Sequence, residues 1–105
     1  MRASDGEVFL GLDLNPGTAT VGMCAEYAAI GAMVTSGKRG IETMVAIAYR
    51  GDGKYAVLPP CGKCRDLARE FGDPYAILQI GREVTDSMKT RVSELVPFPW
   101  DKSKL

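Results

Sequence analysis

Hydrophobic and polar positions along this chain follow two different spacings. Strand-like apolar runs cover residues 7–12, 43–49, 55–58, 75–80 and 88–92. Residues 24–35 and 61–71 instead carry alanine, isoleucine, leucine and methionine at helical spacing, and a glycine follows each of these two segments closely. A further turn of helix is predicted at residues 93–96. Strands that alternate with helices in this way indicate an α/β fold with a mostly parallel sheet and helices on both faces.

Turn-forming residues mark the connections between these segments. Asp5-Gly6 predicts a tight turn before the first strand, and Asn15-Pro16-Gly17 predicts a loop after it. Gly51-Asp52-Gly53 predicts a turn between two neighbouring strands. Because residues 43–49 are apolar on both faces, this strand is expected to be central in the sheet.

Length and composition indicate a single small globular domain that covers residues 1–105. Hydrophobic residues make up 46% of the 105 residues and charged residues 25%, which is an ordinary globular composition. Thirteen basic and thirteen acidic side chains give a formal net charge of +0, so charge offers no reason to expect nucleic acid as a partner. The same balance leaves little repulsion against self-association, for which Phe98 and Trp100 are candidate interface residues.

The chain carries no sign of a membrane span or of a secretory leader. No apolar run approaches the roughly 20 residues of a membrane helix, and the N-terminus lacks the apolar core of a signal peptide. We therefore expect a cytoplasmic protein whose three cysteines stay reduced and are free to bind metal or to react. Because the chain contains no histidine, histidine-based catalysis and imidazole-containing zinc sites are excluded.

The candidate chemistry lies in the three cysteines, each at the predicted start of a helix. Cys24 begins the first helix, and Cys61 and Cys64 share one face of the first turn of the second. Thiolates are stabilised at helix N-termini, so this placement indicates a metal site. Zinc fits best because it accepts tetrahedral thiolate ligation. With only three soft ligands in the chain, water is expected in the fourth position, as in catalytic zinc sites.

Two charged residues stand beside these cysteines. Glu26 follows Cys24 by two residues and is placed to move protons between water and a leaving group. Arg65 directly follows Cys64 and is available to offset the negative charge of three thiolates on a divalent ion. Other interpretations stay open: buried structural cysteines, a redox dithiol of Cys61 and Cys64, or a non-catalytic zinc domain that acts as an assembly module.

The motifs around the cysteines resemble those of the cytidine deaminase superfamily. Cys24-Ala25-Glu26, followed later by Pro60-Cys61-Gly62-Lys63-Cys64-Arg65, matches the zinc-deaminase pattern of a ligand, one residue and glutamate, and then Pro-Cys-x-x-Cys. A cysteine as first ligand is similar to the free-nucleoside branch, which includes cytidine deaminases and blasticidin S deaminase. Glu94-Leu95-Val96-Pro97 is similar to the Glu-Leu-Leu-Pro that closes the family's domain, so the resemblance runs from about Asp5 to Pro97.

This resemblance implies a three-layer α/β fold, with a mixed five-stranded sheet between helices and with the family's N-terminal helix and part of its first strand missing. It implies zinc on Cys24, Cys61 and Cys64, attack of zinc-bound hydroxide on the ring carbon that carries an exocyclic amine, and Glu26 as proton shuttle. The implied substrate is a cytosine-type nucleoside or a related aminated heterocycle, and the implied assembly is a homodimer or homotetramer. Backbone groups of Ala25 and Pro59 are expected to meet the substrate's amino group.

Two departures from the family pattern concern the charge of the site and the substrate. Cytidine deaminases often place an arginine directly after the glutamate, where this chain has Tyr27. The family's ribose-binding Asn-x-Glu is replaced by Asp13-Leu14-Asn15, so the hydrogen-bond donor and acceptor have changed places. We take Asp13 and Asn15 as candidate substrate contacts and predict that cytidine itself is a poor substrate. The alternative is that the pair only shapes the following turn.

Overall fold

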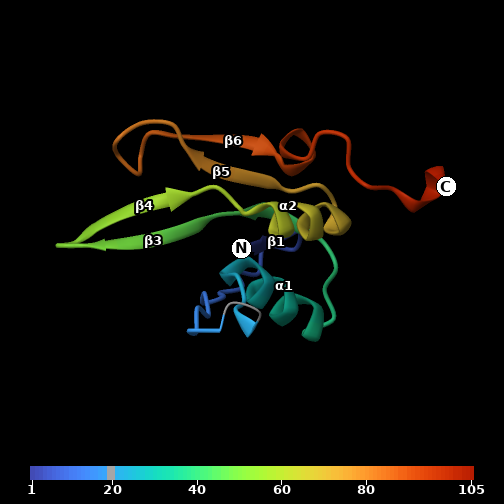
Figure 1. Cartoon of the computed structure of the whole chain (residues 1–105), viewed down its shortest axis with the longest axis horizontal. Helices are drawn as coiled ribbons and strands as arrows, with labels where there is room; N and C mark the ends of the chain where they lie inside the picture. Colours follow the sequence, from blue (N-terminus) through green and yellow to red (C-terminus); the bar gives the residue numbers. More distant parts are fainter. Residues whose placement is uncertain (19–20) are drawn as a thin grey trace.

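The strands form a mixed four-stranded sheet and a two-stranded hairpin (Figure 1). The computed structural model describes residues 1–18 and 21–105. Its strands are β1 (Arg2–Ala3), β2 (Ile41–Met44), β3 (Ala46–Gly51), β4 (Lys54–Leu58), β5 (Tyr75–Gln79) and β6 (Ser87–Arg91). The α-helices are α1 (Ala25–Thr35) and α2 (Gly62–Ala68), with short 3₁₀ turns η2 (Arg69–Phe71), η3 (Val92–Leu95) and η4 (Lys102–Lys104). Along the part of the chain described here, no helix is both long and apolar enough to cross a bilayer.

The sheet runs in the order β1-β2-β5-β6, and only β2 and β5 pair in parallel. The other pairs, β1–β2, β5–β6 and the β3–β4 hairpin, are antiparallel. The mostly parallel sheet expected from the alternation of elements is therefore wrong, whereas the mixed sheet implied by the family resemblance is confirmed. That sheet has four strands in place of the implied five, because β3 and β4 pair with each other as a separate hairpin. Short connections decide the difference, because β3–β4 and β5–β6 are joined by too few residues for a parallel crossover.

The strand predicted at residues 43–49 is divided at Val45 into β2 and β3. Its β2 part lies between β1 and β5 and is central, as expected. Its β3 part leaves that sheet and pairs with β4 to form a hairpin that projects from the body of the molecule (Figure 1). The predicted turn at residues 51–53 closes this hairpin, and all three of its residues have positive φ.

The first predicted strand, residues 7–12, is wrong beyond its second residue. Val8 makes one antiparallel bridge to Arg2 after the predicted turn, in which Gly6 has a φ of 94°. Phe9 still exchanges backbone hydrogen bonds with Met1, at 2.7 and 2.9 Å, but Gly11 lies against the start of α1 instead of in a strand. A Cβ at Gly11 would collide with the carbonyl oxygen of Ala25, so only glycine permits this approach of two backbones. Of the loop predicted after this strand, residues 19–20 lie outside the described part.

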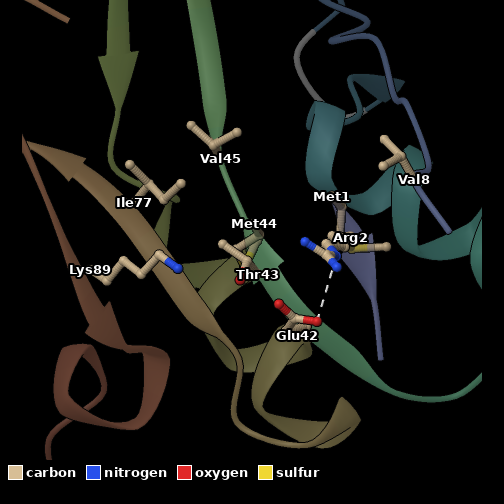
Figure 2. Close-up of a pocket in the computed structure, with 9 residues that line it drawn as sticks. All are labelled: Met1, Arg2, Val8, Glu42, Thr43, Met44, Val45, Ile77 and Lys89. Carbon is tan, nitrogen blue, oxygen red and sulfur yellow. Dashed lines mark ion pairs between the residues drawn. The ribbon is translucent and has the colours of Figure 1, made fainter. Parts of the chain in front are cut away.

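Both predicted helices are confirmed, although the second becomes a 3₁₀ turn for its last three residues. Their buried side chains pack together on one face of the sheet, in a core built from Ala29, Ile30, Met33, Ile41, Met44, Ala68 and Ala76. The opposite face presents Thr43, Ile77 and Lys89, which line a shallow hollow (Figure 2). Within the described residues, the expected α-helices on both faces are therefore found on one face only.

Candidate active site

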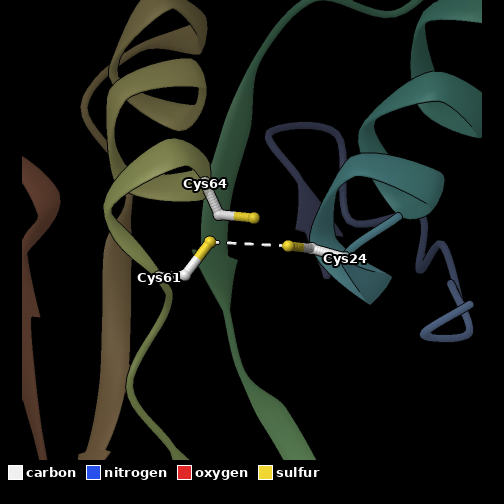
Figure 3. A group of neighbouring side chains, drawn as sticks. All are labelled: Cys24, Cys61 and Cys64. Carbon is white, nitrogen blue, oxygen red and sulfur yellow. Dashed lines mark hydrogen bonds between the residues drawn. The ribbon is translucent and has the colours of Figure 1, made fainter. Parts of the chain in front are cut away.

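The three cysteines converge where the two α-helices begin (Figure 3). Cys24 is the N-cap of α1, Cys61 is the N-cap of α2, and Cys64 lies in the first turn of α2. Their Sγ atoms all lie within 4.8 Å of one another, and those of Cys24 and Cys61 are 3.4 Å apart. The residues are free thiols, so the fold brings together two helix starts that are far apart in sequence.

This sulfur cluster fits a zinc ion. Tetrahedral zinc with Zn–S bonds of about 2.3 Å keeps its sulfur ligands about 3.8 Å apart, which lies within the spread of the three Sγ atoms. Neither N-cap cysteine uses its side chain to cap its own helix, so both sulfurs are available as ligands. Cys64 is buried while Cys61 is exposed, so the cluster has one side open to solvent.

The three thiols differ in how readily they ionise. Burial raises the pKa of Cys64 well above its usual range. A hydrogen bond with Cys61 raises the pKa of Cys24. Burial also acts to raise the pKa of Cys61, but hydrogen bonds from the backbone N–H groups of Cys64 and Lys63 and from the neighbouring thiols lower this pKa overall. The position of Cys61 at the N-terminus of α2 acts in the same direction, because a helix start stabilises a thiolate.

Glu26 lies beside the sulfur cluster. It occupies the first turn of α1, and its Oε2 accepts a hydrogen bond from the Cys64 thiol at 3.7 Å. The carboxylate of Glu26 is thus in direct contact with one of the candidate metal ligands. A carboxylate at that position can exchange protons with a molecule held at the open side of the cluster.

A cavity of about 320 Å³ adjoins Glu26. Ala25 and Glu26 form one side of it, and Glu26 is the one ionisable side chain among the described residues that line it. The remaining wall is mainly apolar and includes Phe9, Met44 and Ile47. This volume is at the lower end of the range for small-molecule sites, and it suits a single heterocycle more than an extended ligand.

A second hollow of about 290 Å³ lies on the other side of β2 (Figure 2). Arg2 and Glu42 form an ion pair of 3.6 Å at its edge, and Lys89 reaches in from β6. Neither Glu26 nor Ala25, which precedes it at the start of α1, is among its lining residues, whereas both line the first cavity. The cavity beside Glu26 is therefore the better candidate for the substrate.

Comparison with known proteins identifies the family of this chain. No protein-family model matches it. A blasticidin-S deaminase from Bacillus cereus is 27% identical to it over 108 residues, which cover 98% of this chain and 75% of that protein. A cytidine deaminase from Halalkalibacterium halodurans is 33% identical over 93 residues, which cover 89% of this chain and 67% of that protein. The chain belongs to the cytidine deaminase superfamily.

Solved cytidine deaminases have the same fold. The enzyme from Bacillus anthracis superposes with a TM-score of 0.78 at 20% identity, over 98% of this chain and 73% of that one. The enzyme from Mycobacterium tuberculosis gives a TM-score of 0.69 at 21% identity, over 94% of this chain and 73% of that one. These similarities confirm the α/β deaminase fold that the cysteine motifs implied.

The guanidinium group of Arg65 donates hydrogen bonds to two backbone oxygens. Its Nε donates to the carbonyl oxygen of Pro60 at 2.7 Å, and its Nη1 donates to that of Leu95 at 3.3 Å. It therefore ties the entry of α2 to η3, close to the cysteines, and its role in offsetting their charge stays a prediction. Pro59, the other predicted contact in this region, is exposed just after β4.

A second cation, Lys63, lies near the three cysteines and was not singled out by the sequence analysis. Lys63 belongs to the same turn as Cys64, and its Nζ lies 4.2 Å from the ring centre of Tyr27. The pair joins the first turns of α1 and α2 through a cation–π contact. Tyr27 thus holds the positive charge of Lys63 beside the start of α1. Only the three-dimensional pairing of the helices reveals this contact.

Asp13 and Asn15 are exposed and do not line the cavity beside Glu26. They flank Leu14, whose backbone N–H and C=O both pair with Met23 at 2.8 Å, next to Cys24. Their role as substrate contacts stays a prediction. The cavity wall itself, including Phe9 and Ile47, was not singled out from the sequence because apolar wall residues look the same as core residues there.

Proposed function

We propose that this chain is a zinc-dependent hydrolytic deaminase of a cytosine-type nucleoside or a related aminated heterocycle. The observation that carries the proposal is the 3.7 Å contact between Glu26 Oε2 and Cys64 Sγ, at the edge of a cavity that Glu26 also lines. Relatives named as a blasticidin-S deaminase and a cytidine deaminase support the same reaction class. Residues 1–105 form a single zinc domain in this proposal.

Cys24, Cys61 and Cys64 would hold the zinc ion. When bound, the ion supplies Lewis acidity that lowers the pKa of water and so provides a nucleophile at neutral pH. Glu26 takes one proton from the attacking water and delivers it to the ring nitrogen, and it then takes the remaining proton from the newly added hydroxyl and delivers it to the departing amine. The substrate exchanges its amino group for an oxygen and releases ammonia, and Glu26 ends the cycle as a carboxylate.

The cavity walls hold the ring of the substrate. Phe9, Met44 and Ile47 offer apolar surface that excludes water from the ring, while the backbone of Ala25 is close enough to Glu26 to meet the amino group. Removing water strengthens the interaction of Glu26 with the protons it carries. The cavity thus supplies binding and orientation, and the first turns of the two helices supply the reactive groups.

An ammonia-release screen tests this proposal. Wild-type protein with one equivalent of zinc is incubated with cytidine, deoxycytidine, cytosine and blasticidin S, and zinc content is measured in the same preparation. We expect ammonia from at least one compound and none from protein stripped of zinc. Bound zinc without turnover on any aminated nucleoside or base would favour the assembly module. Absence of zinc together with a Cys61–Cys64 disulfide would favour the redox protein.

A further inference from the structure

One side-chain hydrogen bond joins the β3–β4 hairpin to the four-stranded sheet. Gln79, the last residue of β5, accepts this bond through its Oε1 from the backbone N–H of Val57 in β4, at 2.8 Å. Because β3 and β4 pair only with each other, no backbone ladder connects β4 with β5. Across the part of the chain that the structure describes, no other hydrogen bond and no ion pair ties the hairpin to the sheet.

The amide group of Gln79 is held in one orientation. Its Nε2 donates to the carbonyl oxygen of Gly81 at 2.8 Å and to that of Arg82 at 3.2 Å, so both of its N–H donors and its oxygen have partners. The turn that follows β5 thereby directs the amide oxygen toward β4. The side chain is half-buried, which strengthens these hydrogen bonds relative to fully solvated ones.

The bond from Val57 acts on one wall of the cavity beside Glu26. Val57 lies opposite Ile47 in the hairpin register. Since the N–H of Val57 points to β5 and not to β3, the two residues form a non-hydrogen-bonded pair, in which cross-strand side chains approach most closely. Ile47 and the preceding Ala46 both line the cavity, and we call these two residues the hairpin wall. The position of the hairpin wall therefore follows the position of β4.

The two sides of this cavity differ in how firmly they are held. Ala25, Glu26 and Ala29 line it from α1, a helix whose buried residues belong to the hydrophobic core. The hairpin contributes no residue to that core and projects from the body of the molecule (Figure 1). An element with few buried apolar contacts moves readily unless polar contacts hold it. The bond to β5 is such a contact, and its loss would free the hairpin without disturbing α1.

We propose that Gln79 is a positioning residue that fixes the distance between the hairpin wall and Glu26, and so sets how tightly the cavity holds a substrate. This inference rests on the proposed deaminase function of the same cavity. Gln79 lines neither the cavity nor the sulfur cluster, so it acts through Val57 and not on the reacting atoms. A residue of this kind changes the binding of the substrate and leaves proton transfer by Glu26 unchanged.

The test separates KM from kcat. Gln79→Met keeps the length of the side chain and removes every hydrogen bond of the amide. On the compound that the ammonia-release screen finds to be turned over best, we expect KM to rise by roughly three- to tenfold, with kcat and zinc content unchanged. Ser93→Ala is the matched control, because it also loses a side-chain hydrogen bond of 2.8 Å, to Asp73, but lies in η3 away from both hollows. This control is expected to keep the wild-type KM.

Hydrogen exchange gives a second measurement that requires no turnover. Backbone amides of residues 46–58 are expected to exchange faster in Gln79→Met than in the wild-type protein, while those of α1 stay protected and Ser93→Ala leaves the hairpin unchanged. Equal hairpin exchange in Gln79→Met and the wild-type protein, or a lower kcat at unchanged KM, would overturn the proposal. A wild-type protein that turns over none of the compounds contradicts the deaminase function instead, and hairpin exchange then decides whether Gln79 holds the hairpin wall.

Discussion

Replacing Glu26 by glutamine tests the role of the carboxylate separately from that of the neighbouring thiols. Glutamine keeps the size and hydrogen bonding of the side chain but cannot carry a proton. We expect the variant to keep its zinc and to lose turnover by ~10² or more, the usual scale for loss of a general acid–base. Glu70→Gln, at an exposed carboxylate in η2, is the control and should retain full activity. Near-normal ammonia release by Glu26→Gln would show that the assigned role is wrong.

Lys63 is expected to stabilise the metal site through its charge. Its ammonium group packs on Tyr27 and lies one residue from Cys64, so Lys63→Gln removes a positive charge beside three thiolates. An exposed cation–π contact contributes ~0.5–1 kcal/mol. If the variant loses this much stabilisation of the metal site, its zinc affinity falls by about two- to fivefold. Competition with a chelator measures this, with Lys54→Gln in the distant hairpin tip as control. Equal competition curves for the two variants would contradict the prediction.

Replacing Asp13 by alanine tests whether the predicted substrate contacts are made. If it meets the substrate, Asp13→Ala should lower kcat/KM on the best substrate by about ten- to a hundredfold, the effect of one mismatched buried polar contact of ~1–3 kcal/mol. Because the order of acid and amide is reversed relative to the family, cytidine is expected to stay below ~10⁴ M⁻¹s⁻¹. An unchanged efficiency in Asp13→Ala would assign Asp13 and Asn15 to shaping the loop.

At the level of elements, the contact between Gly11 and α1 fixes the position of the helix start that carries Cys24 and Glu26. A Cβ at Gly11 would meet the carbonyl oxygen of Ala25 and come within 2.6 Å of the backbone nitrogen of Ala29. Because neither backbone atom can rotate away, Gly11→Ala must displace the helix start that carries Cys24 and Glu26. We expect a loss of ~1–3 kcal/mol in the free energy of unfolding, measured with urea, together with weaker zinc binding.

Gly31→Ala is the matched control within the same helix. A Cβ there meets no atom within 4 Å, and Gly31 lies inside α1, where alanine is the better helix former. We expect the free energy of unfolding to rise by ~0.5–1 kcal/mol and zinc binding to stay the same. If both glycine variants behave alike, close packing at Gly11 is not what positions α1.

The elements that sequence reasoning placed correctly are those with local signals. The two helices and their N-terminal cysteines follow from periodicity and from residues that end helices, and the turn at residues 51–53 follows from its glycines. The strand expected at residues 7–12 failed because a strand also needs a partner, which alternation alone cannot reveal. Leu10 and Leu12, two apolar residues of that predicted strand, are 85% and 76% exposed.

The same limit applies to the site. The cysteines and Glu26 could be singled out because their spacing along the chain matches the zinc-deaminase motif, and the structure brings them into contact. The contact of Lys63 with Tyr27 and the cavity wall at Phe9 could not be found, because both depend on how distant elements pack. A sheet order with one parallel pair is likewise a property of the whole arrangement of strands.

For the whole molecule, metal removal is expected to lower stability as well as activity. A metal that binds the native site and not the unfolded chain stabilises the protein by its binding free energy. We expect the melting temperature to fall when zinc is chelated under reducing conditions, and to recover when zinc is returned. A melting temperature unaffected by chelation of stoichiometric zinc would mean that the ion is not held by the folded cysteine cluster.

One sulfur cluster joins the starts of both helices, and this arrangement affects how long the protein survives in a cell. Cys24 and Cys61 are 37 positions apart, so their sulfurs meet only after both helices have docked on the sheet. With the proposed zinc ion on these cysteines, a newly made chain that finds no zinc is expected to keep this junction loose and to stay open to proteases for longer. The abundance of the protein should therefore follow the supply of zinc: starvation for the metal would shorten its half-life, and the Cys64→Ala variant would be short-lived whatever the supply.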